Sequence, residues 1–385
     1  MADLTAPDLA APDLTVAAGH VLALKLFDVA NAIDLKRAEA LWAGHAAGRA
    51  ARARLTGTAP KAMAFGEPPL GIVLGPSMLD LGGETVEAAA TARLYEFGVA
   101  SIALRVPASG RSWPDYVALL NAIDRAVGPA APAALWDRLL AQLLGVLGPA
   151  LERPNLTDLR EDYLIGVVQS FDGTAGGRMT ASDLLAAVDL VPLLSGEARP
   201  LSDGARADLL RARFSYYTDD LVVLTWDRAF IYEPRGDADV ADVLEVANAQ
   251  LLEMRYYDEL LDDELPRMYD LVESTRRGLN VLAARRYAGL ARRLYTLVAE
   301  VTELTEKVDN ALQVTEDVYL ARVYAAALDL FRVPTVSAAV DRKLAIVRDT
   351  YAALYDEASS SRSELMEAAI LLLILVEIVL ALIRH

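Results

Sequence analysis

The segment Leu365–Ile383 contains 19 residues, of which only Glu367 and Glu377 are charged. About 20 apolar residues are needed for a helix that crosses a hydrocarbon core roughly 30 Å thick. We therefore predict that residues 365–383 form a single transmembrane helix. The alternative is a buried core helix or an oligomerising helix, but only Arg384 and His385 follow the segment, so nothing after it would cover it.

Glu377 lies near the far end of this apolar segment, where a carboxylate costs about 2.5–3.5 kcal/mol on insertion scales. The cost falls if the carboxyl group reaches the membrane interface or is protonated. It also falls if Glu377 pairs with another helix. From the third alternative we predict that Glu377 takes part in transmembrane helix association and that the chain is a homo-oligomer.

The composition limits the classes of protein and the compartment. The net charge of −17 argues against DNA or RNA binding, because phosphate contacts need a basic surface. Cysteine is absent, which excludes disulfides, thiolate zinc sites and cysteine nucleophiles. Arginine outnumbers lysine, 32 to 5, as is typical of a GC-rich bacterial genome. The acidic N-terminus lacks the basic region of a signal peptide. We expect a single-pass protein of the bacterial inner membrane with its N-terminal bulk in the cytoplasm.

Residues 19–236 predict an α+β fold in two parts, 19–130 and 131–236, after a disordered tail at 1–18. In the first part we expect an antiparallel sheet with helices on one face. Its strands are expected at His20–Ala30, Pro68–Leu74, Glu84–Phe97 and Gly98–Val106, and its helices at Asp34–Gly48, with Asp34 as the cap, and Pro114–Val127. In the second part we expect strands at Tyr163–Phe171, Phe214–Tyr217, Leu221–Trp226 and Ala229–Tyr232, and helices at Leu135–Leu147 and Ala181–Leu194.

Residues 237–364 predict a long antiparallel helical stalk. A first helix is expected at Ala238–Ser274, interrupted at Pro266, a second at Arg285–Phe331, and a third from Pro334. Apolar residues in the second helix recur every three or four positions, which is the spacing of a coiled-coil seam. The seam positions are Leu294, Leu297, Val301, Leu304, Val308, Ala311, Thr315 and Val318, and then Val340, Leu344, Val347, Tyr351 and Leu354 in the third helix.

The segment RLYEFGVASIAL has the pattern of a strand pair, and LVVLTWDRAFIYEP that of a strand before the long helices. Together with two C-terminal segments, they resemble the early strand pair and the later strand of the required-for-meiotic-nuclear-division family. RVYAAALDLFRVPTVSAAVDRKLAIVRDTYAALYDE and SELMEAAILLLILVEIVLALI resemble its helical pair and its final, glutamate-containing hydrophobic helix. The resemblance spans most of residues 20–384, with Leu151–Leu201 outside it. It implies membrane attachment without an assigned activity, and its mitochondrial members are thought to support organelle translation at the inner membrane.

No residue pattern indicates a catalytic, cofactor or metal site. The three histidines, His20, His45 and His385, are too scattered for a metal site or a Ser-His-Asp arrangement.

Two polar segments have a simpler interpretation than a ligand site. The loop Gly173–Thr180 lacks the Gly-x4-Gly-Lys-Ser/Thr spacing of a phosphate loop, so we expect a turn followed by a helix capped by Thr180. The acidic cluster at 258–264 lacks EF-hand spacing, which favours a solvated helical face over a divalent-cation site.

Arginines gather where the first two long helices would be joined. Six arginines and no acid lie between Ser274 and Ala299, whereas the preceding residues 237–270 are strongly acidic. Pairing between the two segments is one interpretation. The other is that four arginines at the tip contact anionic membrane lipids, at about 1 kcal/mol each. We assign this contact to Arg276, Arg277, Arg285 and Arg286.

Together these features predict a membrane-anchored, cytoplasm-facing scaffold or adaptor, with membrane lipids and other copies of the chain as partners. The alternative is an enzyme or a small-ligand sensor with a pocket in the α+β part. A deep pocket with convergent polar groups would favour this alternative, and an exposed apolar or charged patch would favour the scaffold.

Overall fold

A computed structural model of the chain describes residues 14–45, 50–52, 63–64, 68–155, 157–172, 178–276 and 317–350, with isolated positions between 289 and 314 and between 352 and 374. The chain divides into two compact units. The first, which we call the α+β unit, comprises Met1–Glu253 and Val308–Val333. The second, the helical unit, comprises Met254–Lys307 and Pro334–His385.

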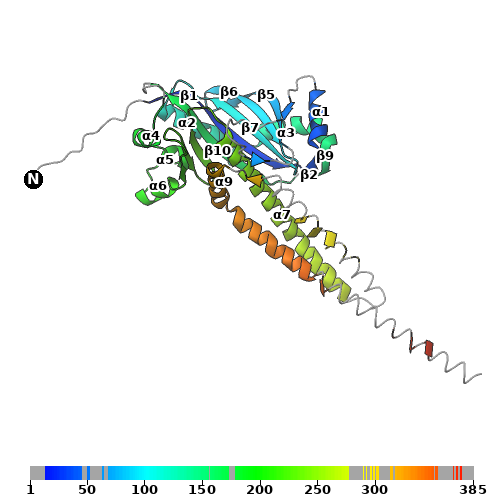
Figure 1. The fold of residues 1–385 in the computed structure, drawn as a ribbon. Coiled ribbons are helices and arrows are strands. Elements are labelled where there is room, and N and C mark those ends of the chain that lie inside the picture. Colours follow the sequence, from blue (N-terminus) through cyan, green and yellow to red (C-terminus); the bar gives the residue numbers. More distant parts are fainter. Residues whose placement is uncertain are drawn as a thin grey trace, which may run out of the picture. The chain divides into compact units, whose positions relative to one another are not determined.

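The α+β unit is built on one large sheet, and Figure 1 shows several of its strands side by side. In spatial order the strands are β11 (Arg213–Phe214), β12 (Leu221–Leu224), β13 (Arg228–Tyr232), β10 (Arg160–Phe171), β1 (Thr15–Asp28), β7 (Val99–Pro107), β6 (Thr85–Leu94), β5 (Leu70–Asp80) and β3 (Ala50–Arg52), with β8 (Arg111–Ser112) also pairing with β1. Two small ladders pair β2 (Ala30–Ile33) with β9 (Leu151–Pro154) and β4 (Met63–Ala64) with β14 (Gln313–Val314). The predicted α+β class is therefore confirmed.

The sheet is mixed, which corrects the predicted antiparallel sheet. β10 and β13 run parallel, whereas the other strand pairs described in the sheet are antiparallel. A parallel pair needs a crossover rather than a hairpin. The crossover contains the short helices α4 (Ala181–Ala187), α5 (Val191–Ser195) and α6 (Asp203–Leu209).

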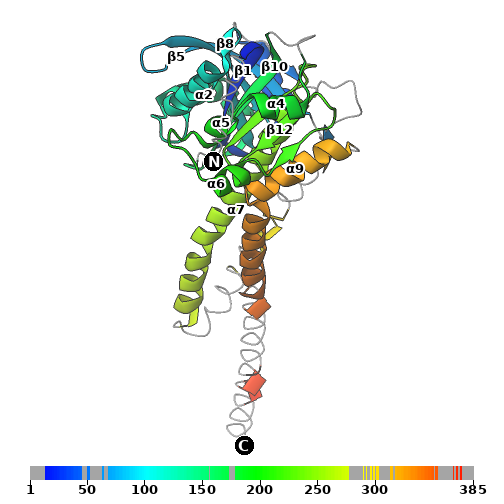
Figure 2. The same ribbon diagram turned by 90° about the vertical axis from the view of Figure 1, so that its left-hand side faces the viewer.

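Helices lie on both faces of the sheet, not on one face as predicted. On the first face Tyr116 of α2 (Trp113–Val127) donates to the carbonyl oxygens of His20 and Val167, at 3.1 and 3.3 Å. A Cβ built on Gly166 would meet Tyr116, Leu120 and Leu193, so even-numbered positions of β10 face α2 and α5. Figure 2 shows α2 and α5 lying against this face. Helices α1 (Leu35–Ala43), α3 (Ala134–Leu147) and the 3₁₀ turn η1 (Gly148–Ala150) complete this layer.

The opposite face is covered by α9 (Val318–Leu330) and by the part of α7 (Asp239–Arg276) that belongs to the α+β unit, up to Glu253. Ion pairs join the start of α7 to β6. At the end of α9, the ring of Phe331 packs edge-on against the ring of Tyr163 in β10, with 5.2 Å between the ring centroids. Successive side chains of a strand point to opposite faces, so Tyr163 and Val167 lie on the face away from α2.

Two predicted boundaries need correction. β1 begins at Thr15 rather than His20, and Leu14 and Val16 are buried, so the predicted tail at 1–18 overlaps the core by several residues. The predicted border at 130/131 does not separate two sheets, because β10 pairs with β1 along most of its length. Residues 19–236 therefore lie in one unit around a common sheet.

Three helix predictions also differ from the structure. Ala181–Leu194 is divided into α4 and α5, with Pro192 in the first turn of α5. α7 continues through Pro266 without the predicted interruption. The predicted helix Arg285–Phe331 is not continuous, because Gln313–Val314 is a strand and α9 starts at Val318, where Asp317 accepts bonds from the next backbone N–H groups.

The helical unit contains the later part of α7 and nearly all of the helix Val333–Thr350. Lys343 pairs with Asp258 at 2.6 Å and with Asp262 at 2.7 Å. Four predicted seam positions, Val301, Val340, Leu344 and Val347, are buried, whereas Val318 is 73% exposed. The other eight seam positions all lie outside the described residues, so the coiled-coil stalk remains a prediction.

Within the described part of the chain, no single helix has both the length and the apolar composition of a membrane span. Val318–Leu330 and Val333–Thr350 meet these criteria only as a pair, with a bend between them. The predicted span at 365–383 lies outside the described residues apart from five positions, so the transmembrane helix remains a prediction.

Gly98 closes the turn between β6 and β7 against β2. Its φ of +101° suits glycine, and a Cβ there would lie 1.7 Å from the carbonyl oxygen of Ala30. The backbone of β2 thus reaches the turn only because residue 98 has no side chain.

We expect Gly98→Ala to lower the free energy of unfolding by about 3 kcal/mol, since it combines backbone strain with a clash against backbone. Gly82→Ala is the matched control, because Gly82 has φ +83° but nothing within 4 Å of its added Cβ, and about 1 kcal/mol is expected there. Urea unfolding followed by tryptophan fluorescence compares the two. Equal losses would show that the contact with Ala30 contributes nothing.

Candidate functional site

A cavity of about 720 Å³ lies on the α7 face of the sheet, entirely within the α+β unit. Small-molecule sites usually measure about 300–1,000 Å³. Its lining includes residues of β1 (His20, Leu22), β6 (Ala89, Arg93), β7 (Ala103, Arg105), β10 (Val167, Gln169), β13 (Ile231) and the start of α7 (Ala241, Asp242, Glu245). The sheet forms one side of the cavity and α7 contributes to the other.

Strand register places the lining side chains in rows across the sheet. Arg105 of β7 lies between its partners Leu22 of β1 and Ala89 of β6. On the other side of β1, His20 pairs with Val167, which pairs with Ile231 of β13. Paired residues share a face, so these side chains lie on the side away from α2. The surface around Arg105 is therefore largely apolar.

Arg93 fixes the start of α7 to the sheet. Its guanidinium donates to Asp242 at 2.8 Å and to Glu245 at 2.7 Å, and Glu245 also accepts a 3.1 Å bond from the Tyr95 hydroxyl. The two acids are three residues apart, which places them on one side of the helix. The side chains of Arg93, Asp242 and Glu245 are only 22%, 11% and 7% exposed. We call Arg93, Asp242 and Glu245 the helix clamp.

The pKa directions agree with this geometry. Burial acts to lower the pKa of Arg93, but the charges of Glu245 and Asp242 outweigh it and raise the pKa well above its usual value. Burial raises the pKa of Glu245, and Arg93 offsets part of that rise. Arg93 therefore stays charged, and it neutralises acids that burial would otherwise disfavour.

His20 and Arg105 form the second polar part of the lining. Burial and the nearby Arg105 charge lower the pKa of His20 to about 4, so its imidazole is neutral at pH 7. Partial burial also lowers the pKa of Arg105. Among the residues that the structure describes, no carboxylate forms an ion pair with Arg105.

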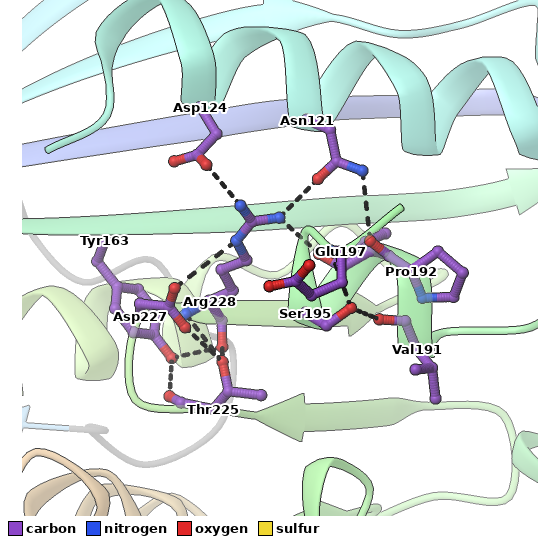
Figure 3. A network of polar contacts seen from close by, with 11 residues as sticks. Asn121, Asp124, Tyr163, Val191, Pro192, Ser195, Glu197, Thr225, Asp227 and Arg228 are labelled. Atoms are coloured by element: carbon purple, nitrogen blue, oxygen red, sulfur yellow. Dashed lines mark hydrogen bonds and ion pairs between the residues drawn. The ribbon is translucent and has the colours of Figure 1, made fainter. Parts of the chain in front are cut away.

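A third arginine, Arg228, has a different environment. Its guanidinium donates to Asn121 at 2.6 Å, to the carbonyl of Leu193 at 3.0 Å and to Asp124 at 2.6 Å (Figure 3). Its side chain is 6% exposed. Gly196 has φ +67°, and a Cβ there would lie 2.5 Å from the guanidinium. Arg228 thus joins α2, α5 and β13, and its donors are directed at the protein.

The site residues predicted from the sequence lie outside the part of the chain whose side chains the structure describes. Arg276 ends α7, but its side chain lies outside the described residues, as do Arg277, Arg285, Arg286 and Glu377. The lipid contact and the helix association therefore remain predictions.

The two simpler interpretations of polar segments are testable in part. Thr180 caps α4 by accepting from the N–H of Asp183, as predicted, while residues 173–177 lie outside the described ones. Two members of the acidic cluster, Asp258 and Asp262, pair with Lys343.

The cavity could not be located from the sequence, because its lining residues lie far apart in the chain. Arg93 and Glu245, for example, are separated by 152 residues. One signal was present: Arg93 and Arg105 lie in mainly apolar strands. An arginine in such a strand needs a carboxylate partner or an open space beside it. Arg93 has the carboxylates, and Arg105 lines the cavity.

Comparison with known proteins places the cavity in a family domain. The model of the family described as "Uncharacterized protein MJ0711, N-terminal domain" matches residues 18–239, and the chain belongs to this family. The match includes the lining residues from the sheet but ends before Ala241, Asp242 and Glu245 of α7.

A curated relative, "Uncharacterized protein MJ0711" from Methanocaldococcus jannaschii, is 26% identical over 194 residues. The aligned region covers 50% of this chain and 58% of the relative. No solved structure matches the chain at a significant level.

We expect Arg93→Met to destabilise the α+β unit by about 3–5 kcal/mol, because it leaves two buried carboxylates without their cation. In a chain that already carries Asp242→Asn and Glu245→Gln, the same change should cost much less. Urea unfolding followed by tryptophan fluorescence measures both.

Arg111→Met is the control, since Arg111 pairs with a Glu84 side chain that is 59% exposed, and less than about 1 kcal/mol is expected. An equal cost of Arg93→Met in both backgrounds would contradict the helix clamp.

Proposed function

We propose that this member of the MJ0711 N-terminal-domain family is a membrane-anchored, cytoplasm-facing adaptor that binds a small ligand in its α+β unit. The observation that supports the ligand is the cavity between the sheet and the start of α7, whose lining combines apolar side chains with polar and charged groups. Pockets with these properties are the usual sites for small molecules. The proposal combines the predicted adaptor with its sensor alternative.

Binding is favoured over catalysis by the state of the lining residues. An efficient general base has a pKa near the working pH, whereas the pKa of His20 is lowered to about 4. Asp242 and Glu245 already accept bonds from Arg93. The described lining therefore favours recognition of a ligand over proton transfer.

Membrane attachment is proposed through the segment 365–383. At its described positions, Ile370, Leu371, Leu373 and Ile374 are each between 47% and 67% exposed. A cluster of exposed apolar side chains usually marks a surface for lipid or protein. The low charge content of the whole segment favours lipid.

The remaining proposals concern lipid contacts, oligomer formation and the membrane compartment. We propose that Arg276, Arg277, Arg285 and Arg286 contact anionic lipid headgroups, and that Glu377 supports homo-oligomer formation between spans. The resemblance of the C-terminal segments to the required-for-meiotic-nuclear-division family supports attachment to the bacterial inner membrane.

The ligand proposal predicts that the full chain, purified in mild detergent, retains a small molecule. Native mass spectrometry should show the added mass, and Ala241→Phe should remove it by placing a ring in the cavity. Ala207→Phe on α6 is the control, because Ala207 is exposed and does not line the cavity. No retained molecule in the wild-type chain, or equal retention in all three proteins, would count against the proposal.

The anchor proposal predicts that the full chain sediments with membranes and that deletion of residues 365–385 releases it. A full chain that is soluble without detergent would refute the anchor. Glu377→Leu should leave membrane insertion intact but weaken oligomers measured by mass photometry.

The chain that lacks residues 365–385 also tests whether the four arginines contact lipid. Its flotation with anionic vesicles should fall with salt and should be lost when all four are replaced by glutamine. Equal flotation of this variant would show that the arginines do not contact lipid.

A further inference from the structure

The three arginines described above differ in one respect that bears on the ligand. Arg93 has two carboxylates, and Arg228 has two carboxylates, an amide and a carbonyl. Arg105 has no anionic partner among the described residues, and its exposed side chain lines the cavity. An arginine whose donors are not used within the protein is available to bind an anion. We therefore look for that anion in a ligand of the cavity.

We propose that the cavity binds a ligand with an anionic head group, a carboxylate or a phosphate, and an apolar body. In this arrangement the guanidinium of Arg105 donates to the anion, as arginine does in bidentate contacts with carboxylates and phosphates. The inference rests on the proposed ligand binding and names the chemical class of that ligand.

The surroundings of Arg105 suit such a ligand. Its cross-strand neighbours Leu22 and Ala89 are apolar, and so are Val167 and Ile231 further along the same face. These side chains provide a surface for an apolar body beside the cation. The His20 imidazole, neutral at pH 7, and the amide of Gln169 also line the cavity. Both groups can donate a hydrogen bond to an anion.

The acids of the lining do not provide the missing partner. Asp242 and Glu245 are directed at Arg93, at 2.8 and 2.7 Å. No ion pair is found between Arg105 and Asp237, which is exposed. The helix clamp thus pairs the two buried carboxylates of the lining with Arg93, and the charge of Arg105 stays available to a ligand.

The test uses three probes that share an aromatic ring: benzoate, phenyl phosphate and benzyl alcohol. Their affinities for the full-length chain in detergent, stripped of any retained molecule, are measured by ligand-observed NMR. We expect at least one anion to bind at least tenfold more tightly than benzyl alcohol. The better anion identifies the head group as carboxylate or phosphate, and competition by inorganic phosphate shows whether the head group alone is enough.

Two variants and a control assign the anion contact to Arg105. Arg105→Gln should weaken anion binding at least tenfold and leave binding of benzyl alcohol unchanged. Arg105→Lys keeps the charge and should retain most of the affinity, which separates a lost charge from a misfolded chain. Arg111→Gln, outside the cavity, should have no effect.

Three results would overturn the inference. These are equal binding of the anions and the alcohol, anion binding that is unchanged in Arg105→Gln, and absence of anion binding. None of them decides the proposed function, because the retained-ligand experiment with Ala241→Phe tests occupancy of the cavity whatever the charge of its ligand. Conversely, a retained neutral molecule would support the cavity and refute the anionic class.

Discussion

The contact between Arg93 and the two acids of α7 sets the architecture of the α+β unit. A helix that crosses a sheet is held mainly by apolar packing, which allows it to slide or tilt. The helix clamp adds two short, directed bonds between a largely buried guanidinium and carboxylates three residues apart. Such a network changes the free energy of unfolding little when it is intact. Loss of one partner is strongly destabilising, because a charge then stays buried without its counterpart. The position of α7, and therefore one wall of the cavity, depends on it.

Arginine has three different roles in this one unit. In the helix clamp it neutralises acids and fixes a helix, and at Arg228 it joins α2, α5 and β13 through bonds to side chains and a carbonyl. Arg105 forms no ion pair with an acidic side chain among the described residues. The same side chain thus acts as a structural contact where its donors are used within the protein and as a recognition group where they are not. Arg105 is therefore assigned to ligand recognition because of its lack of protein partners, and not because of its residue type.

Sequence patterns predicted the local elements better than their assembly. Alternation of apolar residues located the strands β6, β7, β10 and β13 to within a few residues, and the caps Asp34 and Thr180 were identified correctly because a cap depends on a few neighbouring residues. The parallel pairing of β10 with β13 has no local signature, so the sheet was predicted to be antiparallel. The strand at Gln313–Val314 was hidden within a helical heptad pattern, since its partner β4 lies far away in the chain. The cavity was missed for the same reason: Arg93, Arg105 and Glu245 come from three separate elements.

The central place of β1 has a consequence for synthesis of the protein on the ribosome. β1 is the first strand of the large sheet to be made, yet Lys25 bonds to Asp162 of its neighbour β10, 137 residues later. At elongation rates of roughly 5–20 residues per second, that interval is on the order of ten seconds. During it, one long apolar edge of β1 has no native partner, and such edges pair readily with other chains. Until β10 has been synthesised, the unpaired edge of β1 can therefore pair with other chains. A chaperone that binds the first 30 residues would cover this edge during that interval.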